Sequence, residues 1–116
     1  MFGEFNNQKP MKITGIAIDH QPLVVPEHAN STNCYHVFMI YCINNYQFRI
    51  RNSETLKKWF KLSPNYPDFN RAIHYNRIHE CNGLYYTDWR GTKQKESVMV
   101  RIANELNFEV TFEIEG

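Results

Sequence analysis

The spacing of hydrophobic residues changes near Asn107. Before it, "SVMVRIANEL" places apolar residues three and four positions apart, as on one face of an α-helix. After it, "FEVTFEIE" alternates apolar with charged or polar residues, as in a strand with one buried face. The pattern predicts a helix over residues 92–107 and a strand over residues 108–115. The side chains expected to face inward are Val98, Met99, Ile102, Ala103, Leu106, Phe108, Val110, Phe112 and Ile114.

A second pattern centres on Asn82-Gly83, which separates the runs "RIHEC" and "LYYTD". Asn-Gly is a strong signal for a two-residue hairpin turn, because both residues accept positive φ angles. We therefore expect a β-hairpin here. Its register pairs Cys81 with Leu84, His79 with Tyr86 and Arg77 with Asp88.

A longer apolar segment, "CYHVFMIYCI" (34–43), ends at Asn44-Asn45 and is followed by "YQFRIRN". We interpret the two runs as another hairpin, because the Asn pair also tolerates a tight turn. Strand alternation then defines a core face made of Tyr35, Val37, Met39, Tyr41, Ile43, Tyr46, Phe48 and Ile50. The opposite face is mixed and carries Cys34, His36, Phe38, Ile40, Cys42, Gln47, Arg49 and Arg51.

The remaining segments complete the predicted order of elements. "MKITGIAID" (11–19) predicts a strand, and the polar stretch 20–33 a long loop. Ser53, or Asn52 before it, can cap a helix over 54–61, and Pro67 suits the start of another short helix. The order β-β-β-α-α-β-β-α-β predicts the α+β class: one domain over 11–116, with an antiparallel or mixed sheet and helices packed on one face. Residues 1–10 form a polar leader whose composition permits disorder.

Composition narrows the class of protein. A hydrophobic share of 42% in 116 residues is enough for a folded core. The longest apolar run, "VFMIYCI", is too short to cross a membrane. Three cysteines without a Cys-x-x-Cys pair suit reduced thiols better than disulfides. We therefore expect a cytoplasmic protein with no membrane partner.

Charge is unevenly distributed along the chain. Residues 46–101 carry a net charge of +6 and the rest a net charge of −5, although the whole chain is only +1. The basic middle also contains many aromatic residues. Such a basic surface patch can attract an anionic partner to one side of the molecule, although solvated helix faces would give the same count.

Two mirrored pairs offer metal ligands. "CYH" contains Cys34 and His36, and "HEC" contains His79 and Cys81, a combination that zinc accepts. Both pairs fall on predicted strands, where residues two apart share a face. The spacing differs from that of common zinc sites, however, and two hairpins would have to face each other. We therefore expect no metal site and no cofactor.

The run "HYNRIHE" suggests a different chemistry. His74 and His79 could act as base and acid of a metal-independent ribonuclease, with a nearby cation stabilising the transition state. The sequence contains no recognisable nucleophile elbow or phosphate-binding loop. Ribonuclease activity is therefore kept as an alternative only.

The preferred hypothesis is a non-enzymatic protein-binding role. A small domain without a catalytic motif suits an inhibitor that blocks or adapts another macromolecule, as toxin-immunity or phage anti-defence proteins do. The expected partner is a protein or a ribonucleoprotein, and nucleic-acid binding through a basic, aromatic surface is the alternative. The expected partner-binding residues are Phe38, Arg49, Arg51, Lys57, Lys58, Tyr85 and Tyr86.

Overall fold

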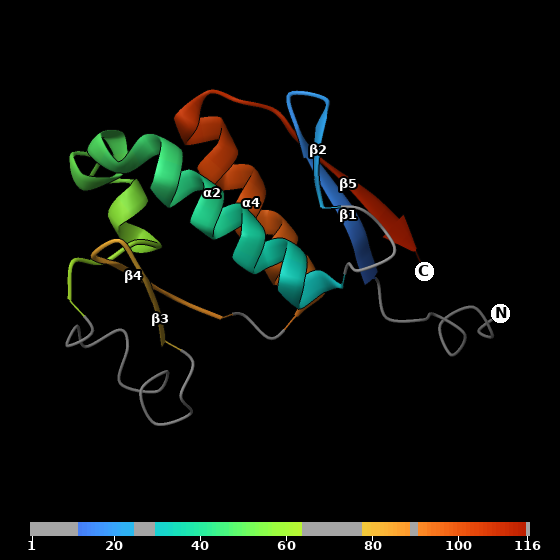
Figure 1. The fold of residues 1–116 in the computed structure, drawn as a ribbon, viewed down its shortest axis with the longest axis horizontal. Coiled ribbons are helices and arrows are strands. Elements are labelled where there is room, and N and C mark those ends of the chain that lie inside the picture. Colours follow the sequence, from blue (N-terminus) through green and yellow to red (C-terminus); the bar gives the residue numbers. More distant parts are fainter. Residues whose placement is uncertain (1–11, 25–29, 64–77, 89–90, 116) are drawn as a thin grey trace, which may run out of the picture.

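The computed structural model describes residues 12–24, 30–63, 78–88 and 91–115. The order of elements is β1 (Lys12–Ile18), β2 (Gln21–Val24), α2 (Ser31–Arg51), the short 3₁₀ helix η2 (Leu56–Lys58), β3 (Ile78–Cys81), β4 (Leu84–Thr87), α4 (Thr92–Leu106) and β5 (Val110–Glu115). The predicted α+β class is confirmed (Figure 1). The described strands form two antiparallel sheets instead of one. Neither described helix combines the length and hydrophobicity that a membrane span requires.

The hairpin expected over residues 34–51 is wrong, because this segment is the helix α2. Its buried residues follow helical spacing: Cys34, Tyr35, Phe38, Met39, Cys42, Ile43 and Ile50. Nearly every position from 34 to 43 is apolar or aromatic, so strand alternation and helical spacing both fitted the sequence. Asn30 caps the helix, since its side-chain oxygen accepts a hydrogen bond of 2.8 Å from the backbone N–H of Asn33.

The Asn44-Asn45 pair marks a kink in α2 in place of a turn. Tyr46 leaves the helical region, with φ −134° and ψ 29°, and the helix continues beyond it. The side chain of Asn45 donates a hydrogen bond of 2.9 Å to the carbonyl oxygen of Tyr41, one helical turn earlier. The displaced Tyr46 ring stacks on Phe108, with ring centroids 5.6 Å apart. The kink therefore turns an aromatic side chain toward the start of β5.

The first sheet has the strand order β2-β1-β5. The expected strands 11–19 and 108–115 are present as β1 and β5, which pair antiparallel. β2 was not expected, because it lies within the predicted loop 20–33. The turn before it, Asp19-His20, has positive φ at both residues (48° and 69°), which suits a two-residue hairpin without the Asn-Gly signature. Ile114 was expected to face inward but is 48% exposed.

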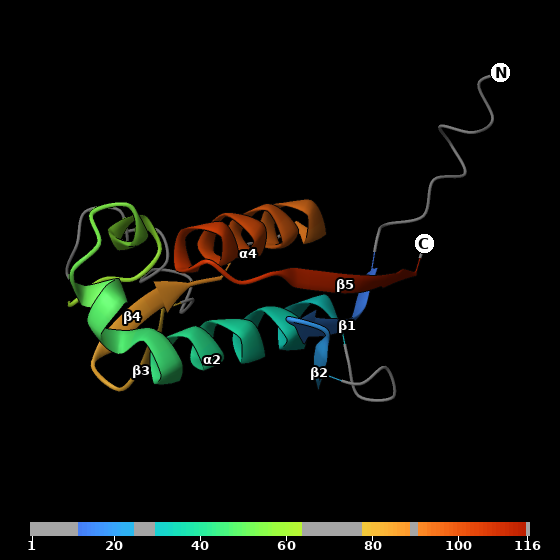
Figure 2. The same cartoon turned by 90° about the horizontal axis from the view of Figure 1, so that it is seen from above.

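Helices α2 and α4 lie side by side and run in the same direction (Figures 1 and 2). At their N-terminal ends, Thr92 Oγ1 donates a hydrogen bond of 3.2 Å to Ser31 Oγ. At their C-terminal ends, Arg49 donates hydrogen bonds to the carbonyl oxygens of Glu105 and Leu106. Buried residues of both helices share one core with Ile13, Ile16 and Ile18 of β1 and with Leu84 and Tyr86 of β4. The C-terminal helix was predicted within one residue of its bounds.

The second sheet is the hairpin β3-β4, and its register is as predicted. His79 pairs with Tyr86 and Cys81 with Leu84, while Arg77 lies outside the described residues. The helix expected over 54–61 is shorter, being only η2, and its N-cap position is Thr55. Ser53 Oγ nevertheless accepts a hydrogen bond of 3.1 Å from the backbone N–H of Leu56, the first residue of η2. Three residues after the end of η2, Lys61 forms a β-bridge with Tyr85. The short helix expected after Pro67 also lies outside the described residues.

Candidate functional sites

Two of the seven expected contact residues are buried. Phe38 is 0% exposed and Tyr86 is 2% exposed, so neither can supply surface for a partner. Phe38 was placed on the mixed face of a hairpin that does not exist; in α2 it packs near Phe108, with ring centroids 5.9 Å apart. Tyr86 lies on β4 and faces α2, and its ring centroid is 6.1 Å from the ring centroid of Tyr35. Tyr85 is half-buried and pairs through its backbone with Lys61.

The four expected cations lie at the surface. Arg49, Arg51 and Lys58 are exposed and Lys57 is half-buried. Arg51 donates a hydrogen bond of 3.3 Å to the carbonyl oxygen of Asn82, and thereby contacts the β3-β4 turn. Lys57 pairs with Glu54 at 3.0 Å. The cations therefore face more than one direction, and only some can share a binding surface.

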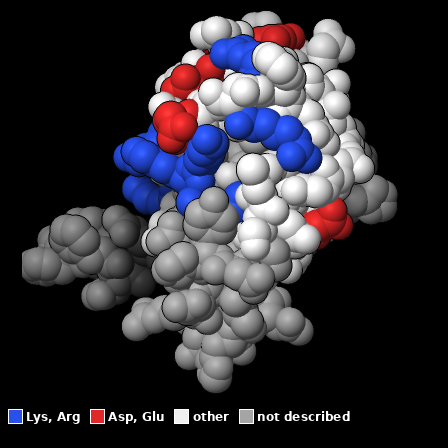
Figure 3. Space-filling model, turned by 90° about the vertical axis from the view of Figure 1, so that its left-hand side faces the viewer, with Lys and Arg blue, Asp and Glu red and all other residues white. Residues whose placement is uncertain are grey.

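A basic cleft lies at the C-terminal ends of α2 and α4. It has a volume of about 500 Å³. The residues that line it are Arg49, Thr55, Lys58, Trp59, Arg101, Asn104, Glu105 and Asn107. Three cations thus converge from α2, the η2 segment and α4, and Figure 3 shows Lys and Arg side chains gathered on this end of the molecule. Arg101 and Trp59 were not among the expected site residues, because their proximity depends on the packing of α4 beside α2.

The mirrored Cys-His pairs meet only in part. His36 and His79 lie together, with ring centroids 4.4 Å apart. Cys34 points away from His36, because residues two apart on a helix do not share a face. Its thiol donates a long hydrogen bond of 3.9 Å to the carbonyl oxygen of Ile13. Cys81 Sγ lies 3.8 Å from Asn44 Oδ1. The four-ligand set of two thiols and two imidazoles considered from the sequence is therefore not assembled.

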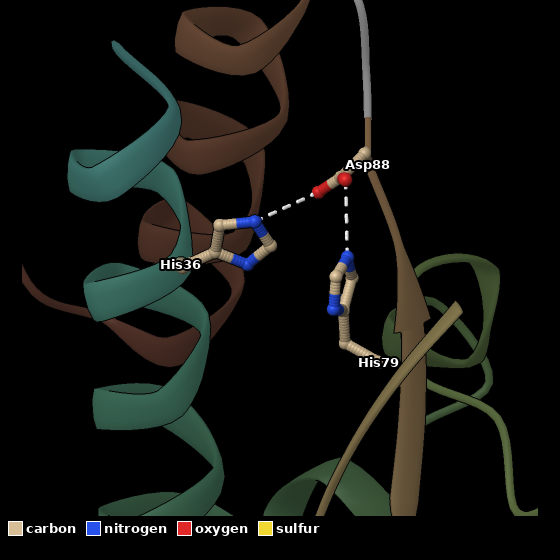
Figure 4. Close-up of side chains that lie close together, drawn as sticks. All are labelled: His36, His79 and Asp88. Atoms are coloured by element: carbon tan, nitrogen blue, oxygen red, sulfur yellow. Dashed lines mark hydrogen bonds and ion pairs between the residues drawn. The ribbon is translucent and has the colours of Figure 1, made fainter. Parts of the chain in front are cut away.

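Asp88 completes a different set with the two histidines (Figure 4). His36 Nε2 lies 3.0 Å from Asp88 Oδ1, and His79 Nε2 lies 3.0 Å from Asp88 Oδ2. The potential ligand atoms of the three residues all lie within 4.8 Å of one another. The side chains of His36, His79 and Asp88 are 23%, 35% and 23% exposed, so solvent reaches the cluster. We call these three residues the His-Asp-His cluster.

Neighbouring residues hold this cluster in place. The Tyr86 hydroxyl lies 3.0 Å from His36 Nδ1, and the Tyr35 hydroxyl donates a hydrogen bond of 2.7 Å to the carbonyl oxygen of Thr87, next to Asp88. Burial lowers the pKa of His36 despite the opposing charge of Asp88, so the imidazole is neutral at pH 7. Burial also raises the pKa of Tyr86 to about 12, so its hydroxyl keeps its proton.

Lys95 adds a buried cation beside the cluster. It is 5% exposed, in the first turn of α4. Burial lowers its pKa, and the charge of Asp88 partly offsets that effect. The carboxylate and two imidazoles of the His-Asp-His cluster therefore lie beside a phenol, Tyr86, and an ammonium group, Lys95. Such a group of side chains can bind a cation or transfer protons.

Asp88 was missed as a site residue, although the sequence contained a signal for it. In the predicted hairpin register, His79 faces Tyr86, and Asp88 lies two residues after Tyr86 on the same side of the strand. His36 could not be placed against them, because its segment was assigned to a strand. No protein-family model, curated protein or solved structure matches this chain.

Proposed function

We propose that this protein works by binding an acidic segment of another protein in the basic cleft, and that it thereby blocks or adapts its partner. The observation that carries the proposal is the convergence of Arg49, Lys58 and Arg101 on one cleft of about 500 Å³. Three neighbouring cations favour an anionic ligand and can attract it to this side of the molecule.

The composition of the cleft supports a protein partner. Arginine and tryptophan contribute strongly to the energy of protein interfaces, and Trp59 lies among the cations. Glu105 and the amides of Asn104 and Asn107 complete the lining. A lining with charges of both signs and several amides can pair with the side chains and backbone of a peptide.

The burial of aromatic side chains weakens the nucleic-acid alternative. Binding of single strands depends on exposed rings that stack on bases. Phe38 and Tyr86, which were expected to provide such a surface, belong to the core. Among the described residues, Phe48 is the one large aromatic side chain that is mostly exposed, at 79%. It precedes Arg49 in α2 and would enlarge the contact area of a protein interface.

The test is a binding experiment with the full chain and matched charge variants. The double variant Lys58→Glu, Arg101→Glu reverses two cations of the cleft and leaves Arg49, which also holds α4, unchanged. Lys93→Glu is the control, because Lys93 is exposed in the first turn of α4, at the opposite end of that helix. Each protein is immobilised and exposed to lysate of the source organism, once with and once without nuclease treatment. Bound proteins are then identified by mass spectrometry.

We expect one protein to bind the wild type and the Lys93→Glu control in stoichiometric amount, and the double variant at least tenfold more weakly. The affinity for the purified partner should fall as salt increases, because exposed charges are screened. A partner that binds the double variant equally well would contradict the cleft as the binding site. Binding that disappears after nuclease treatment would favour a nucleic acid as the ligand.

A further inference from the structure

We propose that His36, His79 and Asp88 form a binding site for a divalent transition-metal ion such as Zn²⁺. Two imidazoles and one carboxylate are a ligand set found for zinc and for non-haem iron. The three ligands come from α2, from β3 and from the residue after β4, so the site exists only in the folded chain. This site is separate from the basic cleft and does not depend on the function proposed for it.

The distances within the cluster suit a bound ion. Ligand atoms placed at about 2.0–2.1 Å from a tetrahedral zinc ion lie about 3.3 Å apart. The two nitrogen-oxygen distances in the cluster are both 3.0 Å. The potential ligand atoms of the three residues all lie within 4.8 Å of one another, so adjustments of the side chains would bring them to these separations.

The hydrogen bonding of Asp88 supports metal binding independently of these distances. Asp88 Oδ1 is buried and has no hydrogen-bond partner among the described residues, although His36 Nε2 is 3.0 Å away. The two atoms are close but not aligned for a hydrogen bond. An acceptor that is buried without a donor is costly, whereas a cation between Oδ1 and Nε2 would satisfy both atoms.

The surroundings of His36 favour coordination through Nε2. Tyr86 lies 3.0 Å from Nδ1, the other ring nitrogen. A metal-bound histidine commonly donates its second N–H to a neighbouring oxygen, which fixes the tautomer and the orientation of the ring. With Zn²⁺ on Nε2, the Nδ1–H group of His36 would donate to the Tyr86 hydroxyl oxygen. Tyr86 would then be a positioning residue for the metal ligand.

The number and exposure of the ligands indicate an open site. Three protein ligands leave at least one position of a tetrahedral ion for water or another ligand. The ligand side chains are 23–35% exposed, so solvent reaches the cluster, although Asp88 Oδ1 itself is buried. Lys95 opposes the binding of a cation because its ammonium group adds positive charge near Asp88. We therefore expect the Lys95→Met variant to bind zinc several-fold more tightly than the wild type does.

The experiment is a calorimetric titration of the metal-free, untagged full chain with Zn²⁺, together with absorption spectra of the Co²⁺ complex. We expect about one equivalent to bind to the wild type. Asp88→Asn preserves the shape of the side chain but removes its charge, and it should weaken binding at least tenfold, as should His36→Ala and His79→Ala. The Co²⁺ complex should show ligand-field bands without sulfur-to-metal charge transfer. Circular dichroism of each variant monitors its fold.

Matched controls separate this site from other histidines and thiols. His20 lies 3.1 Å from Glu109, but both side chains are largely exposed (81% and 59%). His20→Ala and Cys81→Ser should therefore leave the stoichiometry and affinity for zinc unchanged. The proposal would be overturned by less than a tenth of an equivalent on the wild type, by unchanged affinity in Asp88→Asn, or by a thiolate band in the cobalt spectrum. The last two readouts hold even if the alanine variants fail to fold.

Discussion

Arg49 and Leu106 join the C-terminal ends of the two long helices. Arg49 Nη1 donates a hydrogen bond of 3.0 Å to the carbonyl oxygen of Leu106, and Nη2 donates one of 2.8 Å to that of Glu105. The last carbonyl groups of a helix lack intrahelical partners and carry the negative end of its dipole. A guanidinium group from α2 therefore caps α4 and holds both helices at the rim of the basic cleft.

Replacing Arg49 should destabilise the protein. Arg49→Met keeps most of the aliphatic stem but removes both hydrogen bonds, and we expect a loss of about 1–2 kcal/mol in the free energy of unfolding, since the guanidinium group is partly solvated. Arg49→Lys keeps the charge but cannot form the same two-pronged contact, so it should lose less. Urea unfolding measures the free energy of unfolding of both variants and of the wild type. Equal stability of all three proteins would show that the cap contributes nothing.

A substitution at Ile40 tests whether the segment around it is helical. Ile40 is 40% exposed near the middle of α2. Ile40→Pro removes a helical hydrogen bond and introduces a steric clash, so it should cost about 3 kcal/mol or more. Ile40→Ala at the same exposed position should cost less than about 1 kcal/mol, because alanine favours helices. Circular dichroism and thermal unfolding compare the two variants, and similar stability of both would contradict a helix at this position.

Gly83 should resist replacement by alanine. Its φ angle of +83° is costly for a residue with a side chain, and an added Cβ would lie 3.1 Å from Arg51 Nη2. We expect Gly83→Ala to lower the free energy of unfolding by about 1–2 kcal/mol. Lys93→Ala serves as a control on the exposed surface of α4 and should change stability by less than about 0.5 kcal/mol. Unfolding in urea provides the comparison, and a neutral Gly83→Ala variant would indicate that the turn has a different conformation.

The parts of the fold that were predicted correctly are those in which one local signal was decisive. Asn82-Gly83 permits one hairpin register, and the alternation in β5 and the spacing in α4 each fit one kind of element. The helix α2 was not predicted, because apolar residues in this segment fit both strand alternation and helical spacing. The pair Asn44-Asn45, which suits a hairpin turn, lies instead at a kink in the helix. Here tertiary packing decided between helix and strand.

The candidate sites depend on that decision. The predicted hairpin register already places His79 and Asp88 on the same side of the hairpin. The position of His36 beside them depends on the packing of α2 on the hairpin, which the sequence did not predict. The basic cleft likewise needs α4 to lie beside α2, because Arg49 and Arg101 are 52 positions apart in the chain. Sequence patterns located the basic region and the two histidines but could not specify their partners.

Thiol labelling distinguishes the helix from the hairpin that the sequence suggested. In α2, Cys34 and Cys42 are both 0% exposed, whereas Cys81 on β3 is partly exposed. We expect a thiol reagent to modify one cysteine of the native protein at pH 7.5, and mass spectrometry of peptides should identify it as Cys81. The other two should react only at the rate at which the protein opens. Cys81→Ser should abolish the fast reaction.

Alkaline conditions should not expose Cys42 to the reagent while the protein stays folded. Burial raises the pKa of the Cys42 thiol, so the native state keeps it protonated. Because the folded pKa exceeds the unfolded one, the stability that this difference provides is complete below about pH 8.5 and declines as the pH rises further. Labelling of Cys42 should therefore occur only from the opened chain, and its rate should rise with pH as the thiolate fraction of that opened chain rises, without the fast reaction seen for Cys81. Rapid labelling of Cys34 and Cys42 at neutral pH would instead show that both thiols are accessible, as expected for the hairpin. That result would contradict the helix α2, on which the position of His36 in the His-Asp-His cluster depends.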